Sequence, residues 1–276
     1  MSAYESIVDA CHHGEMKGCY ELGRHFQRRT DTEKAIRYYE IGCKNGYAPS
    51  CMKIGQMYHY GKGIKKNFSK AAKAYKRVMG IDPALGYYLL GTLEYSKKNG
   101  SNETALEYYT LACDKGSAEA CSKLAYFNKS GINVEKDIQK SMAYREKACV
   151  NDRKECLALG DAYANGESGI SHSYVKARKY YGMACSGENA IGCYRLGNLY
   201  YKGNGVRKSY KTAKQYYEKS CSSKNLNGSE RGCNNLAVLY RYGRGVKRDV
   251  DISKKYYDKA CKKGYAEACT VLRSFK

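Results

Sequence analysis

The chain has 276 residues, of which 43% are hydrophobic, so it is long enough to bury a sizeable core. It contains no run of 18 apolar residues, and no transmembrane helix is therefore indicated. The excess of 49 Lys and Arg over 27 Asp and Glu gives a net charge of +22, which would favour nucleic acid, anionic glycans or an acidic protein surface as partners.

The first residues, Met1 to Ala10, show neither the basic region nor the apolar stretch of a signal peptide. We therefore expect either a cytosolic protein or the mature form of an exported protein whose leader has been replaced by an initiator Met.

One sequence unit recurs along the chain. Its clearest copy, Cys193–Cys221, reads CYRLGNLYYKGNGVRKSYKTAKQYYEKSC, with a close copy at Cys233–Cys261 and a third at Cys51–Met79. Self-similarity at a period of 20 to 50 residues is typical of solenoids, in which each unit packs mainly on its neighbours. The low Pro content, with no Trp and many Ala, Leu, Lys, Glu and Tyr, favours helices.

The chain is expected to form a single solenoid domain over residues 1–276. Counted from the first cysteine of each close pair, or from Met79 where it is missing, about seven units and a C-terminal capping helix follow in order: 11–42, 43–78, 79–112, 113–148, 149–184, 185–220, 221–260 and 261–276.

Each unit is predicted to hold two helices, A and B, joined by a loop. In the clearest copy, helix A covers about 190–201 and places Leu196, Gly197 and Tyr200 on one face. Helix B covers about 210–221, after a glycine-rich turn. Glycine costs a helix about 1 kcal/mol relative to alanine. The recurrence of Gly197 at the same place in other units therefore predicts a close helix crossing.

The 14 cysteines fall into seven close pairs. Such regular, even pairing suits a disulfide framework in an oxidising compartment. Since helix B and the next helix A run antiparallel through a short link, the two cysteines of a pair can face one another. Reduced buried cysteines and zinc ligation remain as alternatives, although the spacings lack a zinc knuckle. The pairs are Cys11/Cys19, Cys43/Cys51, Cys113/Cys121, Cys149/Cys156, Cys185/Cys193, Cys221/Cys233 and Cys261/Cys269.

The consensus A-x-x-C-x-x-L-G-x-x-Y-x-x-G-x-G-V, followed by K-A-x-x-Y-Y-x-K-A-C-x-x-G, resembles Sel1-like repeats, which are relatives of the tetratricopeptide repeat. The cysteine pairs are similar to those of the Helicobacter cysteine-rich protein family. The resemblance covers Cys11 to Cys269. It implies an all-α, right-handed α/α superhelical solenoid, disulfides that pair the cysteines in sequence order between neighbouring helices, and export from the cell.

Some members of that family are described as binding penicillin with weak β-lactamase activity. A serine β-lactamase needs S-x-x-K together with S-D-N and K-T-G elements. The chain has two S-x-x-K strings, Ser50–Lys53 and Ser173–Lys176, a number that chance alone produces, and neither of the other elements. The residues thus favour a binding protein over an enzyme. A penicillin-binding protein with weak β-lactamase activity is kept as the alternative.

In helical repeat arrays helix A lines the concave face, and exposed positions that vary between units are free to recognise a ligand. By register with Cys193, the candidate binding face comprises Glu21, Arg24, Lys53, Gln56, Lys123, Tyr126, Asp161, Arg195, Asn198 and Asn235.

Tyrosine pairs such as Tyr180-Tyr181 and Tyr216-Tyr217 recur at one repeat position, so they are expected to pack and not to stack on bases. Nucleic acid is therefore not expected as a partner. Basic runs at 62–66 and 241–248 fall in the inter-helix turns. They form either a cationic stripe, if they line one edge of the solenoid, or ordinary solvated turn charges.

The sequence therefore predicts a secreted or periplasmic, monomeric repeat protein that binds a protein or peptide ligand, with acidic ligands favoured by the charge. A role in contact between host and microbe is one setting for such a protein. No cofactor and no metal site are expected.

Overall fold

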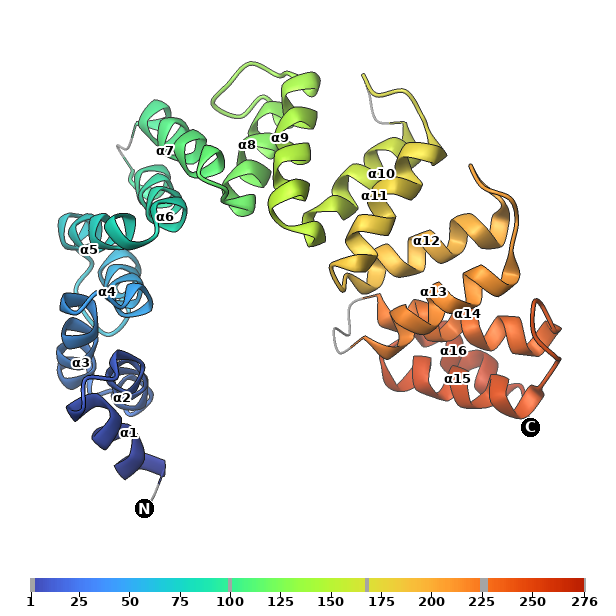
Figure 1. Cartoon of the computed structure of the whole chain (residues 1–276), viewed down its shortest axis with the longest axis horizontal. Coiled ribbons are helices and arrows are strands. Elements are labelled where there is room, and N and C mark those ends of the chain that lie inside the picture. The colour runs from blue at the N-terminus through green and yellow to red at the C-terminus, as the bar shows by residue number, and fades with distance from the viewer. Residues whose placement is uncertain (1–2, 99–100, 167–168, 224–227, 276) are drawn as a thin grey trace. The chain divides into compact units, whose positions relative to one another are not determined.

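The computed structural model describes residues 3–98, 101–166, 169–223 and 228–275, and every regular element in these ranges is helical (Figure 1). The elements are α1 (Ala3–His12), α2 (Met16–Arg28), α3 (Thr32–Lys44), α4 (Ala48–Tyr60), α5 (Phe68–Ile81), α6 (Pro83–Ser96), α7 (Asn102–Asp114), α8 (Ala118–Ser130), α9 (Ile138–Asn151), η1 (Arg153–Glu155), α10 (Cys156–Asn165), α11 (Tyr174–Ser186), α12 (Ala190–Lys202), α13 (Tyr210–Ser222), α14 (Ser229–Tyr242), α15 (Val250–Lys262) and α16 (Ala266–Arg273).

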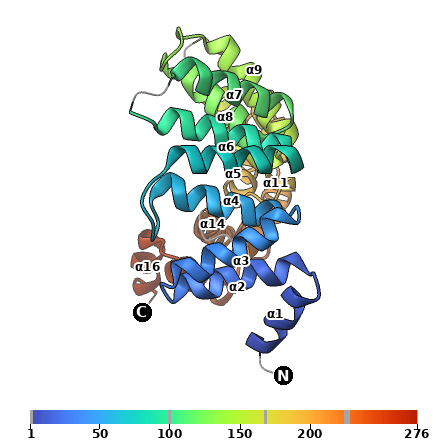
Figure 2. The same ribbon diagram turned by 90° about the vertical axis from the view of Figure 1, so that its left-hand side faces the viewer.

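The helices form two compact units. Unit 1 comprises residues 1–127 and 132–134, and unit 2 comprises residues 128–131 and 135–276, so α8 contributes to both. Within unit 1, consecutive helices from α1 to α7 pack on one another, and Figure 2 shows α2 to α7 as successive layers. Within unit 2, α9 to α16 pack in the same sequential way. The prediction of an all-helical solenoid is confirmed.

Local sequence signals set the helix ends. Helix α13 begins after Ser209, whose side chain accepts a hydrogen bond from the backbone N–H of Thr212, and α15 begins after Asp249 in the same way. Helix α12 ends at Gly203, which adopts a left-handed conformation with φ of 82°. The observed bounds of α12 and α13 extend one residue beyond the predicted helices.

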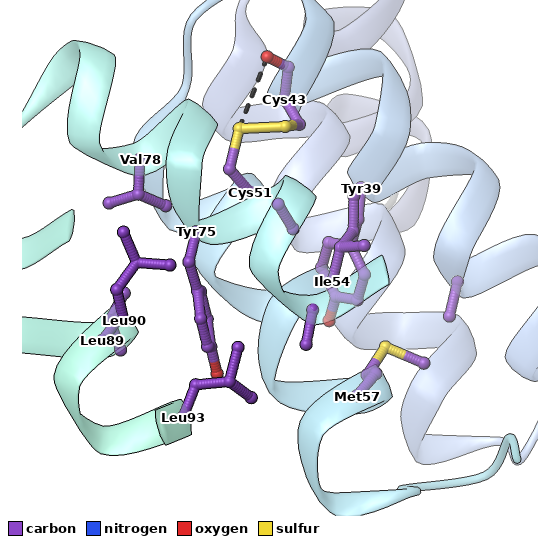
Figure 3. Packing of buried hydrophobic residues seen from close by; sticks show 13 residues of the cluster. Tyr39, Cys43, Cys51, Ile54, Met57, Tyr75, Val78, Leu89, Leu90 and Leu93 are labelled. Atoms are coloured by element: carbon purple, nitrogen blue, oxygen red, sulfur yellow. Dashed lines mark hydrogen bonds between the residues drawn. A yellow bond between two sulfur atoms is a disulfide. The ribbon is translucent and has the colours of Figure 1, made fainter. Parts of the chain in front are cut away.

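A tyrosine ring of helix B lies directly on a glycine of helix A in most repeats. A Cβ atom added to Gly197 would lie 2.6 Å from Cε1 of Tyr217, whose side chain is fully buried. Close helix crossing at this glycine was predicted, and the ring opposite it supplies the physical reason. Figure 3 shows another such tyrosine, Tyr75, enclosed by neighbouring apolar side chains. The pairs are Gly23 with Tyr39, Gly55 with Tyr75, Gly91 with Tyr109, Gly160 with Tyr181 and Gly197 with Tyr217.

Seven disulfides close the connections from one helix B to the next helix A. Their Cα–Cα distances run from 4.4 to 4.8 Å, and no described cysteine is free. Because each bridge closes a short loop, chain entropy gives about 2–3 kcal/mol of stabilisation per bridge. The bridges join Cys11–Cys19, Cys43–Cys51, Cys113–Cys121, Cys149–Cys156, Cys185–Cys193, Cys221–Cys233 and Cys261–Cys269.

One connection, between α5 and α6, holds together without a bridge. There Gly86 lies against Met79, so closely that an added Cβ would overlap the Met79 backbone. Gly192, which precedes Cys193, makes the same close approach to the helix before it. A small residue at this place thus lets the two helices touch, and the disulfide secures an approach that packing already permits.

The glycine–tyrosine contact predicts the outcome of two matched substitutions. G197A should lower stability by about 1–3 kcal/mol, because the added methyl group overlaps the Tyr217 ring. G182A, in α11, is the control: nothing lies within 4 Å of its added Cβ, and alanine should raise stability by up to about 1 kcal/mol. Thermal melts followed by circular dichroism measure both changes. A melting temperature of G197A at or above the wild-type value would show that the contact does not limit packing.

The disulfides predict the mass and the thiol reactivity of the native protein. Full reduction should raise the intact mass by about 14 Da, since each bridge lacks two hydrogens, and denatured protein should not be alkylated before reduction. The material should come from the native host, because oxidation during purification of a recombinant chain would give the same result. Alkylation at most cysteines before reduction would contradict the framework.

Candidate functional site

The ten predicted binding residues all lie on helices at the A position, namely α2, α4, α8, α10, α12 and α14. Nine are partly exposed, and Tyr126 is 55% exposed. They fall into three groups, one on α2 and α4, one on α8, and one across α10, α12 and α14.

The group in unit 2 forms a connected line across three repeats. The Nε atom of Arg195 lies 3.1 Å from Oδ1 of Asp161, which joins α12 to α10. The Nδ2 group of Asn235 donates to Oδ1 of Asn198 at 3.0 Å, which joins α14 to α12. We refer to Asp161, Arg195, Asn198 and Asn235 as the polar row.

Two tyrosine hydroxyls donate hydrogen bonds to residues of the polar row. Tyr181 donates to Oδ1 of Asp161 at 2.7 Å, and Tyr217 donates to Oδ1 of Asn198 at 2.7 Å. Burial, together with the bond to Asp161, raises the pKa of Tyr181, so this hydroxyl stays protonated and remains a donor. Since Oδ1 of Asn198 already accepts from Tyr217 and Asn235, its Nδ2 group is the part that can still bind a ligand.

The sequence did not identify these hydroxyls as part of the site. It placed tyrosines such as Tyr181 and Tyr217 in the core, and their rings are indeed buried. Their position in the repeat could have indicated this role, because Asp161 and Asn198 each directly follow the glycine on which the tyrosine ring lies.

The group in unit 1 is cationic. Arg24 makes an ion pair with Glu21 at 3.1 Å, and Lys53 is half-buried on the neighbouring helix α4, one turn before Gln56. Burial lowers the pKa of Lys53, and repulsion by Lys62 and Arg24 lowers it further. The charged form of Lys53 is therefore less favourable in the free protein than that of an isolated lysine, and an anionic ligand would relieve that cost.

On α8, Lys123 lies near two aromatic rings. Its ammonium nitrogen is 6.0 Å from the ring centroids of both Tyr95 and Phe127, a cation–π distance. Tyr126 is exposed beside it. This third group offers a cation and an aromatic face together.

One serine of the S-x-x-K strings is buried and the other caps a helix. Ser50 is fully buried, close to Gly42 of the preceding helix, where no substrate reaches it. Ser173 caps α11 by accepting a hydrogen bond from the backbone N–H of Lys176. Neither is arranged as the nucleophile of an acyl-transfer reaction.

Buried His59 also has a structural role. Its Nε2 lies 2.6 Å from Oγ of Ser96, and its Nδ1 lies 3.3 Å from the hydroxyl of Tyr75. Ser96 donates its own hydrogen to the carbonyl oxygen of Leu93, so it accepts from Nε2–H, and Nδ1 then accepts from Tyr75. Both nitrogens are used in the core, and burial lowers the pKa of His59, which favours the neutral ring.

In the described ranges, no three His, Cys, Asp or Glu side chains gather closely enough to hold a metal ion. Among the same residues, none of the helices has the length and apolar character needed to cross a membrane.

The unfavourable charge of Lys53 predicts a stability effect. K53M should raise the melting temperature by about 1–2 °C at neutral pH, because methionine keeps the apolar stem without the charge. The gain should shrink as pH rises through the lowered pKa of Lys53 towards 10.5, where lysine becomes neutral in the unfolded chain as well. K65M, which removes an exposed loop lysine, is the control and should leave the melting temperature unchanged. Equal stability of K53M and wild type at pH 7 would refute the argument.

Comparison with known proteins agrees with this architecture. The chain matches the Sel1 repeat family seven times, at residues 17–47, 48–76, 84–117, 118–149, 156–189, 190–225 and 231–265. These boundaries begin at helix A, whereas the units counted from cysteines begin near the end of helix B.

Among characterised relatives, the ERAD-associated E3 ubiquitin-protein ligase component HRD3B of Arabidopsis thaliana is 26% identical over 67% of this chain, and the match spans about a third (32%) of that protein. A protective antigen of uropathogenic Escherichia coli with an SLR fold aligns over 100% of this chain and 67% of its own, with 20% identity and a TM-score of 0.56, which supports the fold alone.

Helicobacter pylori cysteine rich protein B is 31% identical over 51% of this chain and 99% of its own, with a TM-score of 0.40. The repeats matched in sequence cover most of the chain, and seven disulfides join neighbouring helices within and beside them. The chain therefore belongs to the Sel1 repeat family.

Proposed function

We propose that this protein binds an extended segment of a partner protein along the A-helix positions of its repeats. Sel1 repeat proteins are protein-interaction modules, and one relative is a component of an E3 ubiquitin-protein ligase. The observation that carries the proposal is the polar row, in which side chains from three successive repeats are joined and oriented. A line of fixed amide and charged groups suits the evenly spaced polar groups of an extended peptide backbone.

The proposed ligand carries acidic side chains. In unit 1 the positive charges of Arg24 and Lys62 act on Lys53, and the carboxylate of Glu21 is already paired with Arg24. A ligand carboxylate placed there would neutralise a cation that burial and repulsion disfavour.

We further propose that the protein works in an oxidising compartment, as a secreted or periplasmic protein. Seven disulfides support this, since such bridges persist outside the reducing cytosol. The two S-x-x-K serines do not support the alternative of β-lactam hydrolysis, since Ser50 is buried and Ser173 caps a helix.

The proposed peptide site can be tested with N198D. This substitution keeps the oxygen that accepts from Tyr217 and Asn235 but replaces the Nδ2 donors with a second oxygen. Peptides selected from a phage-displayed library of random dodecamers on the oxidised wild-type protein should bind N198D about tenfold more weakly or worse, because a donor becomes a repelling acceptor.

The control for this experiment is Q215A, which truncates an exposed residue of helix α13 outside the polar row and should leave affinity unchanged. Selected peptides that bind N198D as tightly as wild type would refute the proposed site. A library that yields no binder on the folded wild-type protein would refute peptide binding itself.

A further inference from the structure

Two loops of unit 2, the loop between α12 and α13 and the loop between α14 and α15, share one conformation and lie side by side. Each contains two glycines with positive φ, 82° and 65° at Gly203 and Gly205 and 66° and 69° at Gly243 and Gly245. An added Cβ at Gly245 would lie 2.6 Å from Cβ of Tyr210, so the second loop rests on the start of α13, where the first loop ends. Equivalent residues of the two loops therefore recur along one edge of the unit.

This edge carries a dense group of cations. Each loop presents a basic pair at equivalent positions, and further cations flank the glycines. We refer to these residues as the loop edge: Lys202, Arg207, Lys208, Arg244, Lys247 and Arg248, of which all but the half-buried Arg244 are exposed.

The sequence around the two loops carries few acidic residues. No Asp or Glu occurs between Glu188 and Glu218, or between Arg231 and Arg248. The nearest acidic residues in sequence are Asp249, whose carboxylate caps α15 through the backbone N–H of Ile252, and exposed Asp251 in the first turn of that helix. The two loops therefore carry a local excess of positive charge.

Tyrosine rings hold some of these cations in place. The guanidinium of Arg244 lies 5.5 Å from the ring centroid of Tyr201 and 5.3 Å from that of Tyr242. The ammonium of Lys208 lies 4.9 Å from the ring of Tyr210. Cation–π contacts of this kind restrict the side chains and so reduce the entropy lost when an anion binds.

We propose that the loop edge binds a linear anionic polysaccharide that carries sulfate or carboxylate groups. Basic pairs repeated from one loop to the next fit a polymer whose charges also recur. Because sulfate and carboxylate groups sit directly on a sugar ring, they lose less rotational freedom on binding than the side chains of an acidic peptide. Single-stranded nucleic acid fits less well, since it stacks its bases on aromatic faces that cations occupy at this edge.

Binding of heparin to the oxidised full chain tests the proposal. The variant R207Q/K208Q/K247Q/R248Q should bind heparin about tenfold more weakly or worse at 50 mM salt, and wild-type affinity should fall steeply between 50 and 200 mM salt. The matched control K179Q/K219Q/K255Q/K259Q removes the same charge from exposed positions on α11, α13 and α15 and should lose less than about threefold.

Either of the following results would overturn the proposal. Equal losses in the two variants would show that net charge alone attracts heparin. Poly-glutamate or single-stranded DNA of matched charge that competes as well as unlabelled heparin would show that the edge is not a polysaccharide site. N198D should bind heparin normally, so failure at the loop edge is distinguishable from failure of the proposed peptide site.

Discussion

The contact between a helix B tyrosine and a helix A glycine is the interaction on which the repeats depend. Glycine leaves room for a flat ring to lie on the helix backbone, and the buried ring contributes much of the apolar area of its repeat. A buried tyrosine still needs a partner for its hydroxyl. In the repeat of Tyr217 that partner is Asn198, the residue next to the glycine, so one contact both packs the helices and orients a surface group.

The disulfides cross-link the connections between one repeat and the next. The glycine–tyrosine contact joins helix A to helix B within a repeat, whereas each bridge joins helix B to the helix A that follows. The approach of Gly86 to Met79 shows that small residues allow this second junction even where no cysteine is present. The bridges therefore act mainly by limiting the unfolded chain, which suits a protein exposed to proteases and denaturing surroundings.

The A-helix positions carry different chemistry in the two units. In unit 2 the ligand candidates are paired with one another, as Asp161 is with Arg195, so their geometry is set before a ligand arrives. In unit 1, Lys53 is held where its charge is disfavoured. The first arrangement favours specificity through preorganisation, and the second provides a driving force for binding an anion at some cost in stability.

Much of the fold could be predicted because its signals are local and repeated. The period, the helix pairs, the cysteine spacing and the recurring Gly197 position all lie within one or two turns of helix or recur from unit to unit. The exposed A positions followed from the same register. The ion pair of Asp161 with Arg195 could not be predicted, since it joins residues a whole repeat apart and depends on how closely two helices approach.

The sequence by itself thus determined the repeat, its helices and which residues face outward, because periodic patterns specify faces. Only the tertiary structure decided which of those residues meet. It buried Ser50, which the S-x-x-K string alone left open as a nucleophile, and it brought two basic loops together through the contact of Gly245 with Tyr210. Pairings between repeats depend on distances of a few ångströms between helices, and no local pattern specifies those distances.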